Sequence, residues 1–296
     1  MYGYKERMNK MAIRTDLALE KRELAGDCEG VQSEEETFGE AKVTRIKITN
    51  EAGEKAVGKP VGNYITIEMR PFSNESSVED SRREAVSKEL ERLLPKEGTV
   101  LIAGLGNCDI TPDALGPKTV GKIFATRHIS DELAGSVGLG KLRAVCAMAP
   151  GVLGKTGIET AEILLGVVRK IQPAAVVVVD ALASRNLSRL GCTVQLSDTG
   201  ICPGSGVGNS RSEISEKTLG IPVVSVGVPT VVDAATLAEE LLGSGDLGDQ
   251  KDKAGQMMVT PREIDSVIDH AAGLLSLSIN CALHPHLAAE DLMALV

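Results

Sequence analysis

The sequence predicts an α/β fold, with a mostly parallel sheet flanked by helices and an N-terminal β-hairpin extension. From Thr99 onward, short apolar runs alternate with longer segments of helical periodicity, which is typical of parallel sheets. A chain of 296 residues with 43% apolar content can bury a substantial core, so we expect one large domain with appended segments. The apolar runs that predict strands are residues 99–103, 142–148, 175–179, 193–196 and 223–226.

The part of the chain before Thr99 predicts the extension. Residues 1–40 are charged and weakly periodic, and the run 33–36 (Ser-Glu-Glu-Glu) is interpreted as a solvated loop. Apolar and polar residues alternate over 43–49 and again over 64–68, with Gly and Pro between them. This pattern predicts a β-hairpin.

Three helices have clear boundary signals. Apolar residues at helical spacing predict an amphipathic helix that ends at Pro95. Thr156 and Glu159 have capping-box spacing and predict the start of a helix that ends before Pro173. The segment 260–263 (Thr-Pro-Arg-Glu) repeats this device, with proline at the first helical position.

Composition excludes several classes of protein. A net charge of −9 and a pI near 5.1 argue against a nucleic-acid surface, which needs clustered Lys and Arg. The six cysteines are scattered with no Cys-x-x-Cys pair, so we interpret them as reduced thiols. We find no apolar run near the roughly 18 residues that a membrane helix needs, and no apolar signal core, so we expect the protein to stay inside the cell.

Two aspartates each follow an apolar run and are separated by one α/β repeat. Asp113 comes shortly after the run 99–103, and Asp180 ends the run of valines at 176–179. Ligands of parallel sheets bind in the crevice outside the carboxyl ends of the strands, so both carboxylates could face one site. A helix cap is the alternative role for each, and Arg185 is a possible partner for Asp180. The leading hypothesis is a hydrolase with two carboxylates.

A phosphate-binding loop is a competing interpretation. Residues 149–156 lie between an expected strand and an expected helix, as a Walker A loop does, with Lys155 as the lysine and Asp180 as a Walker B residue. However, Ala149 replaces the opening glycine, and Pro150 fixes a backbone that must wrap the phosphates.

A second competing motif is the tripeptide 198–200 (Asp-Thr-Gly), which occurs in pepsin-like proteases. Those enzymes are all-β and pair two such loops, whereas here a single copy lies in an α/β pattern. The tripeptide continues into a glycine-rich loop that includes Gly204 and Gly206. We interpret this loop as shaping the site or binding substrate, and keep Asp198 as an alternative partner for a catalytic pair.

The four histidines give no nucleophile–base pair by their spacing. The run His284-Pro285-His286 could bind metal, but a polar C-terminal turn is the preferred interpretation, so we expect no metal site.

Longer motifs resemble the germination proteases of spore-forming bacteria, which degrade small acid-soluble spore proteins. The resemblance covers most of the chain, and its motifs are contiguous. They comprise residues 14–18, 104–107, 111–117, 150–152, 156–160, 180–185, 197–201, 203–209, 227–234 and 258–261.

The resemblance implies a fold similar to that of hydrogenase-maturation endopeptidases and a catalytic pair made of Asp113 and Asp180. It implies no cofactor and no metal, a homotetramer, small acid-soluble spore proteins as substrates, and a place in the cytoplasm of the spore core. No direct contact with nucleic acid or membrane is expected. The secondary candidates for substrate binding are Asn107, Arg185, Asp198, Gly204 and Gly206.

The resemblance also implies a zymogen that removes its own N-terminal peptide. Spore-protein target sites have the form Thr-Glu-(Ile or Phe)-Ala-Ser-Glu, and residues 15–20 read Thr-Asp-Leu-Ala-Leu-Glu. We therefore expect this segment to act as a pseudo-substrate that is cut between Asp16 and Leu17. Residues 1–16 are then a propeptide and residues 17–296 a single protease domain, in which the glycine-rich stretch 243–256 is a connection where relatives carry a longer insertion.

Overall fold

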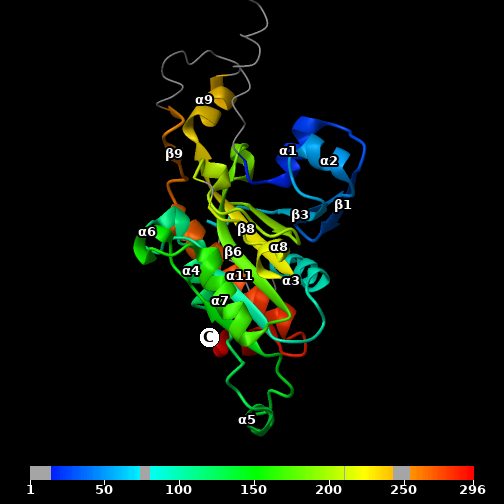
Figure 1. The fold of residues 1–296 in the computed structure, drawn as a ribbon, viewed down its shortest axis with the longest axis vertical. Coiled ribbons are helices and arrows are strands. Elements are labelled where there is room, and N and C mark those ends of the chain that lie inside the picture. Colours follow the sequence, from blue (N-terminus) through cyan, green and yellow to red (C-terminus); the bar gives the residue numbers. More distant parts are fainter. Residues whose placement is uncertain (1–14, 74–80, 210, 243–253) are drawn as a thin grey trace, which may run out of the picture.

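A computed structural model describes residues 15–73, 81–209, 211–242 and 254–296 (Figure 1). The strands in this part of the chain are β1 (Val31–Phe38), β2 (Ala41–Ile48), β3 (Gly62–Glu68), β4 (Val100–Gly104), β5 (Val145–Met148), β6 (Ala175–Ser184), β7 (Thr193–Ser197), β8 (Val223–Asp233) and β9 (Met258–Val259). The helices are α1 (Ala18–Ala25), α2 (Glu51–Val57), α3 (Ser81–Leu93), α4 (Leu115–Val120), α5 (Asp131–Ser136), α6 (Leu153–Thr156), α7 (Thr160–Ile171), α8 (Glu216–Leu219), α9 (Ala234–Leu242), α11 (Ile264–Leu283) and α12 (Ala289–Ala294). Short 3₁₀ turns are η1 (Thr111–Asp113), η2 (Leu187–Arg189) and η3 (Ser205–Val207).

The α/β class is confirmed, but the sheet is mixed rather than mostly parallel. Among the described residues its nine strands run in the order β1-β2-β3-β7-β8-β6-β4-β5, with β9 paired to β8. Strands β8, β6, β4 and β5 are mutually parallel, whereas β1, β2, β3 and β7 pair antiparallel. Residues 185–192 join β6 to β7, which is shorter than the dozen or so residues of a parallel crossover. The antiparallel direction of β7 follows from that short connection.

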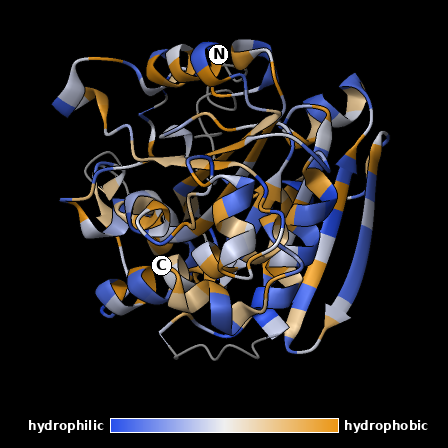
Figure 2. Ribbon diagram, turned by 90° about the horizontal axis from the view of Figure 1, so that it is seen from below, coloured by the Kyte–Doolittle hydropathy of each residue, from blue (hydrophilic) through white to orange (hydrophobic). Residues whose placement is uncertain are grey.

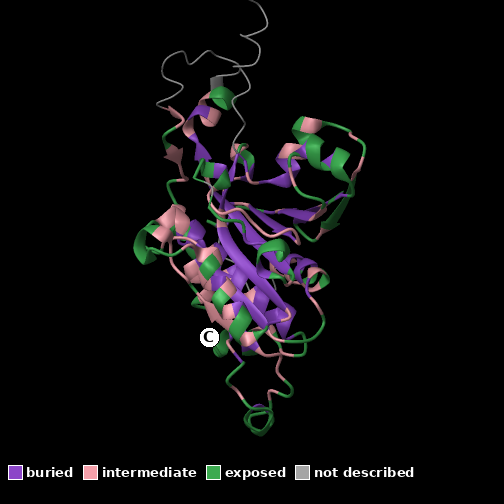
Figure 3. Ribbon diagram, in the orientation of Figure 1, coloured by how far each residue is buried: buried purple, intermediate pink, exposed green. Residues whose placement is uncertain are grey.

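The two faces of the sheet are covered differently. Along β6, Val177 and Val179 belong to the larger apolar core, which includes residues of α3 and α11. Val176 and Val178 point to the opposite face, where they pack with Leu164 of α7. The central strands are buried along most of their length (Figure 3). Toward the carboxyl end of β6, this second face becomes polar.

Among the described residues, helix α11 is long and apolar enough to meet the length and composition criteria for a membrane span, although polar residues interrupt it. Its 20 residues pass that test by length and composition, but 67% of the relevant window is buried inside the fold. Buried residues of α11 contribute to the larger core, so here it is a core helix of the domain.

The N-terminal extension is confirmed as antiparallel strands, with two differences. Helix α2 separates β2 from β3, and β3 continues directly into the main sheet through β7. The acidic run 33–36 is not a loop, because it lies in the edge strand β1. Figure 2 shows this edge strand as mostly hydrophilic, whereas β2 alternates. Charged side chains on an edge strand oppose pairing with other chains.

Both capping-box predictions are wrong in position. Helix α7 begins at Thr160 with Glu159 at its N-cap, and α11 begins at Ile264 with Glu263 at its N-cap, and neither cap residue makes a side-chain cap hydrogen bond. Thr156 instead ends the short helix α6, because Gly157 follows it in the left-handed conformation. Both helices therefore start just after the expected acidic residue.

The domain boundary at residue 16 stays a prediction. Most of the expected propeptide (residues 1–14) and of the connection 243–256 (residues 243–253) lies outside the described residues. Leu17, which would open the mature domain, is fully buried. All six cysteines are free thiols.

Candidate active site

Asp180 lies in the middle of β6 rather than at its end. Strand β4 stops at Gly104, which pairs with Val179, so Asp180 is the first residue of β6 beyond the carboxyl end of its neighbour. Its side chain is 6% exposed, and its Oδ1 accepts a hydrogen bond of 2.9 Å from the Ala181 N–H. Asp180 therefore lies just beyond the carboxyl end of β4, and not at the end of β6 itself.

Asp113 is held by the loop that follows β4. Its Oδ2 accepts a hydrogen bond of 2.7 Å from the Asn107 N–H, and Thr230 Oγ1 donates to the Pro112 carbonyl at 2.8 Å. Gly106 has a φ of +107°, and a Cβ there would lie 2.0 Å from the Asp113 carbonyl oxygen. The Gly-Leu-Gly-Asn motif thus positions the carboxylate, and Asn107 acts through its backbone.

The two carboxylates share one electrostatic environment. Burial raises the pKa of Asp180 well above its usual value, and the nearby charges of Asp113 and then Asp16 raise it further. Burial also raises the pKa of Asp113, against the lowering effect of the hydrogen bond from Asn107. Asp113 and Asp16 are therefore close enough to Asp180 for their charges to oppose its ionisation.

Asp16 is bound at this site through both its backbone and its side chain. Its N–H donates to the Ala183 carbonyl at 2.9 Å, and its Oδ2 accepts from the Ala183 N–H at 2.9 Å. Its Oδ1 accepts from Ser205 Oγ at 2.8 Å. A Cβ at Gly206 would lie 2.1 Å from Asp16 Oδ2, so only glycine leaves room for this carboxylate. The glycine-rich loop therefore contacts the N-terminal segment, residues 15–20, through Ser205 and Gly206.

The next residues of the segment are buried. Leu17 and Ala18 have no exposed surface. The Leu17 N–H donates to Thr15 Oγ1 at 3.0 Å, and the Ala18 N–H donates to Gln195 Oε1 at 2.6 Å. Gln195 Nε2 donates in turn to the Asp16 carbonyl oxygen at 3.1 Å. Gln195 was not among the residues singled out from the sequence.

Glu20 occupies a further polar site. It is 2% exposed, and its carboxylate accepts hydrogen bonds from the N–H groups of Arg185 (2.7 Å) and Asn186 (2.9 Å). Thr15 also donates to it, and Arg189 Nη1 lies 3.8 Å from Oε1. Arg185 therefore contributes its backbone N–H to this site.

The suggested pairing of Asp180 with Arg185 is wrong. Arg185 follows the last residue of β6, and its side chain is exposed. Side chains five positions apart along a strand point to opposite faces and lie roughly 16 Å apart.

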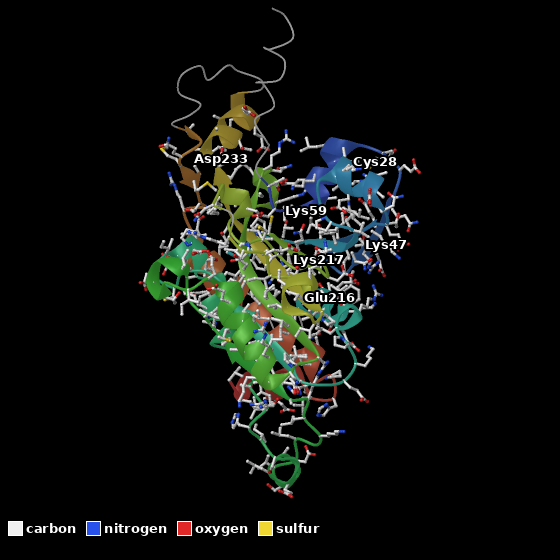
Figure 4. The ribbon with its side chains drawn as sticks, viewed as in Figure 1. Cys28, Lys47, Lys59, Glu216, Lys217 and Asp233 are labelled. Atoms are coloured by element: carbon white, nitrogen blue, oxygen red, sulfur yellow. The ribbon has the colours of Figure 1, made fainter. Side chains whose placement is uncertain are left out.

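A cavity of about 420 Å³ lies beside Asp16 and is lined in part by Lys59, Tyr64, Gln195 and Gly227. Burial lowers the pKa of Lys59 to about 8, although the charge of Asp16 opposes this shift. Figure 4 labels Lys59 between the N-terminal elements and the main sheet, with Lys217 from the region of α8 below it. The cavity therefore lies between Asp16 and the polar side chains of the sheet, which include Gln195, Ser197 and Ser225.

Asp198 is part of a turn rather than of the carboxylate pair. Its Oδ1 accepts from the Asn63 N–H at 2.7 Å and its Oδ2 from Asn63 Nδ2 at 2.5 Å. Gly204, with a φ of +73°, lies opposite the Asn209 carbonyl, which a Cβ would approach to 2.3 Å. Gly204 shapes the loop, and Gly206 alone of the two touches the segment.

The phosphate-loop and metal interpretations gain no support from the geometry. Lys155 forms an ion pair with Asp109 on the surface, away from the buried Asp180. Within the described residues, no group of three or more His, Cys, Asp or Glu side chains is arranged to hold a metal ion. A turn does follow α11 at residues 285–287, as expected, but His284 is fully buried, with its ring centroid 5.7 Å from that of Phe124.

Comparison with known proteins gives the family. The family model described as germination protease matches residues 8–243. The chain belongs to the germination protease family. The germination protease of Clostridium perfringens is 44% identical over 318 aligned residues, which cover 95% of this chain and 98% of that protein. The germination protease of Clostridium tetani is 42% identical, with the same coverage.

Membership of the germination protease family makes the chain a peptidase. Among solved structures, the [NiFe] hydrogenase maturation protease HycI from Thermococcus kodakarensis is similar, with a TM-score of 0.36 and 18% identity over 64% of this chain and 98% of that one.

Proposed function

We propose that this germination protease homologue is an endopeptidase that degrades small acid-soluble spore proteins, and that it is made as a zymogen that cuts itself between Asp16 and Leu17. The observation that carries the proposal is that the charge of Asp16 acts on Asp180, and that Asp16, Leu17, Ala18 and Glu20 are each held by hydrogen bonds to the fold or to the segment itself. This segment has the pattern of the target site that the family resemblance implies.

Each characteristic position of that pattern has a matching contact. The acidic residue before the scissile bond corresponds to Asp16, which meets Ser205 and the Ala183 N–H. The apolar residue and the alanine after the bond correspond to the buried Leu17 and Ala18. The final Glu corresponds to Glu20 with its two backbone N–H donors. The same contacts can recognise a spore-protein segment in place of residues 15–20.

The mechanism uses the two carboxylates in opposite protonation states. Two nearby carboxylates cannot both ionise easily, and the more buried Asp180 has the more strongly raised pKa, so Asp180 retains the proton. The ionised Asp113 takes a proton from a water molecule while the oxygen of that water attacks the carbonyl carbon of the scissile bond. Asp180 then gives its proton to the departing amide nitrogen, and the C–N bond breaks. The products are a new carboxylate and a new amino group.

The pH dependence follows from these protonation states. As the pH rises through the raised pKa of Asp180, its proton is lost and cleavage slows. As the pH falls far enough to protonate Asp113, the general base is lost. Activity therefore has a maximum at mildly acidic pH, which would start self-processing when the spore core acidifies. We further propose a homotetramer in the cytoplasm of the spore core.

The test is to incubate the purified protein at mildly acidic pH and sequence the new N-terminus. A start at Leu17 is expected, and Asp113→Asn and Asp180→Asn should each abolish it. Asp198→Asn is the matched control, because that carboxylate is bound to Asn63 and should be dispensable for cleavage. The proposal is wrong if both variants of the pair retain wild-type self-cleavage and spore-protein hydrolysis. A loss confined to Asp198→Asn, with an unchanged circular dichroism spectrum, would move the chemistry to Asp198.

A further inference from the structure

Gln195 and Asp180 lie in one row across the sheet. Gln195 of β7 is paired with Gly227 of β8, and Gly227 is paired with Asp180 of β6. Residues abreast in neighbouring strands have their side chains on the same face, and two strand spacings are about 10 Å. Gln195 and Asp180 therefore flank a strip of sheet in which the middle position has no side chain.

The bare middle position is required by its surroundings. A Cβ on Gly227 would lie 2.6 Å from Leu182 Cγ and 2.9 Å from the Asp180 carbonyl oxygen. Gln195 and Gly227 also line the cavity of about 420 Å³ beside Asp16. The Leu182 side chain therefore packs over the middle of the strip, and the cavity beside Asp16 is bordered by Leu182, Gly227 and Gln195.

The side-chain amide of Gln195 binds residues 15–20 through both its nitrogen and its oxygen. Nε2 donates to the Asp16 carbonyl oxygen at 3.1 Å, and Oε1 accepts from the Ala18 N–H at 2.6 Å. The side chain is only 7% exposed, so little water competes with these bonds. A carbonyl requires a donor and an N–H requires an acceptor, so the partners fix the orientation of the amide. The two contacts bracket one peptide bond, Asp16–Leu17.

We propose that Gln195 is a catalytic residue of this protease, which holds the scissile peptide and stabilises the oxyanion that forms on it. The inference rests on the proposed function, because it takes Asp16–Leu17 as the bond that is cut. When the water oxygen bonds to the Asp16 carbonyl carbon, the electron pair of the C=O bond moves to the oxygen. The Nε2–H of Gln195 already points at that oxygen, and a donor placed in advance stabilises the developing charge. The electron pair returns as the C–N bond breaks and Leu17 receives its proton.

The same contacts recognise substrates in trans. They involve backbone groups on either side of the scissile bond, so they do not depend on the substrate side chains. Gln195 therefore sets the register of any bound segment relative to Asp180, while Ser205 and the Ala183 N–H select the acidic side chain.

The test compares first-order self-cleavage rates of the full chain from mildly acidic to neutral pH. Gln195→Leu removes the donor and should lower the rate by roughly 10²- to 10³-fold, as the loss of one oxyanion donor does. Gln195→Glu has the same shape and is the decisive variant. Its ionised form repels the oxyanion, but its protonated form donates a hydrogen bond, so its rate relative to wild type should rise steeply as the pH falls. Hydrogen exchange at the Ala18 amide of Gln195→Glu over the same pH range separates a role in docking from a role in catalysis. A role in docking alone predicts that the cleavage rate follows the docked fraction, whereas oxyanion stabilisation predicts a larger change in rate than in docking.

Thr66→Val is the matched control, because Thr66 is the cross-strand neighbour of Gln195 and its buried hydroxyl has no hydrogen-bond partner. It should retain the wild-type rate. Wild-type rates in both Gln195 variants, or a Gln195→Glu ratio that does not change with pH, would overturn the role of Gln195 while leaving the protease proposal intact. If the wild-type chain does not cut at Asp16–Leu17, the protease proposal fails and the role of Gln195 fails with it. Circular dichroism of Gln195→Glu separates a folding defect from a catalytic one.

Discussion

Replacing Glu20 by Gln should release the N-terminal segment from the site. The Glu20 carboxylate is 2% exposed and accepts hydrogen bonds from two backbone N–H groups, of Arg185 and Asn186. A glutamine amide has one oxygen, so its NH₂ group must face one of these two donors. A hydrogen bond to a charged group contributes about 1.5–3 kcal/mol. Since 1.4 kcal/mol is a factor of ten, docking of the segment should weaken roughly 10- to 150-fold.

Hydrogen exchange at the Ala18 amide measures this release directly. That N–H is buried and bonded to Gln195, so it exchanges only when the segment opens. The measurement is made in an Asp180→Asn background, which prevents self-cleavage from removing the signal. In that background, Glu20→Gln should raise the exchange rate by the same factor of roughly 10 to 150.

Glu23→Gln is the matched control on the same helix, α1. Glu23 forms an ion pair of 2.6 Å with Arg189, but its side chain is 46% exposed. Arg189 is only 9% exposed, but it keeps its ion pair of 2.9 Å with Glu68 when Glu23 is replaced, so exchange at Ala18 should rise less than in Glu20→Gln. Equal effects of the two substitutions, or no effect of Glu20→Gln, would show that Glu20 does not anchor the segment.

Three further outcomes are expected. Gly206→Ala puts a methyl group where Asp16 Oδ2 lies and should slow self-cleavage strongly, while circular dichroism and thermal unfolding show a retained fold. Asp16→Asn removes a charge that raises the pKa of Asp180, so the alkaline limb of the self-cleavage pH profile should move to lower pH; an unmoved limb would contradict the electrostatic coupling. Lys155→Ala should leave cleavage unchanged because Lys155 pairs with Asp109 on the surface, and calorimetric titration of the wild type with ATP and magnesium should show no binding.

Much of the fold was predictable from local pattern. Every apolar run chosen as a strand corresponds to one, although β5 occupies only 145–148 of the run 142–148, because short apolar runs between helical segments have few other solutions. Strand direction was not predicted for β7, although the short connection 185–192 was visible in the sequence. The acidic edge strand β1 was missed because its pairing with β2, rather than its own apolar content, makes it a strand.

The candidate site was only partly predictable, and the reason is register. Asp113 and Asp180 were found because each follows an apolar run, a signal that is local in sequence. Gln195 has no such signal: it is one polar residue in the alternating pattern of β7. Its importance comes from lying in one row with Gly227 and Asp180, through one antiparallel and one parallel pairing. A shift of either pairing by one residue would turn Gln195 or Asp180 to the opposite face of the sheet, because side chains alternate with a period of two. The row is therefore a property of the assembled sheet, and its middle position is a glycine because a Cβ there would meet Leu182 and the Asp180 carbonyl oxygen.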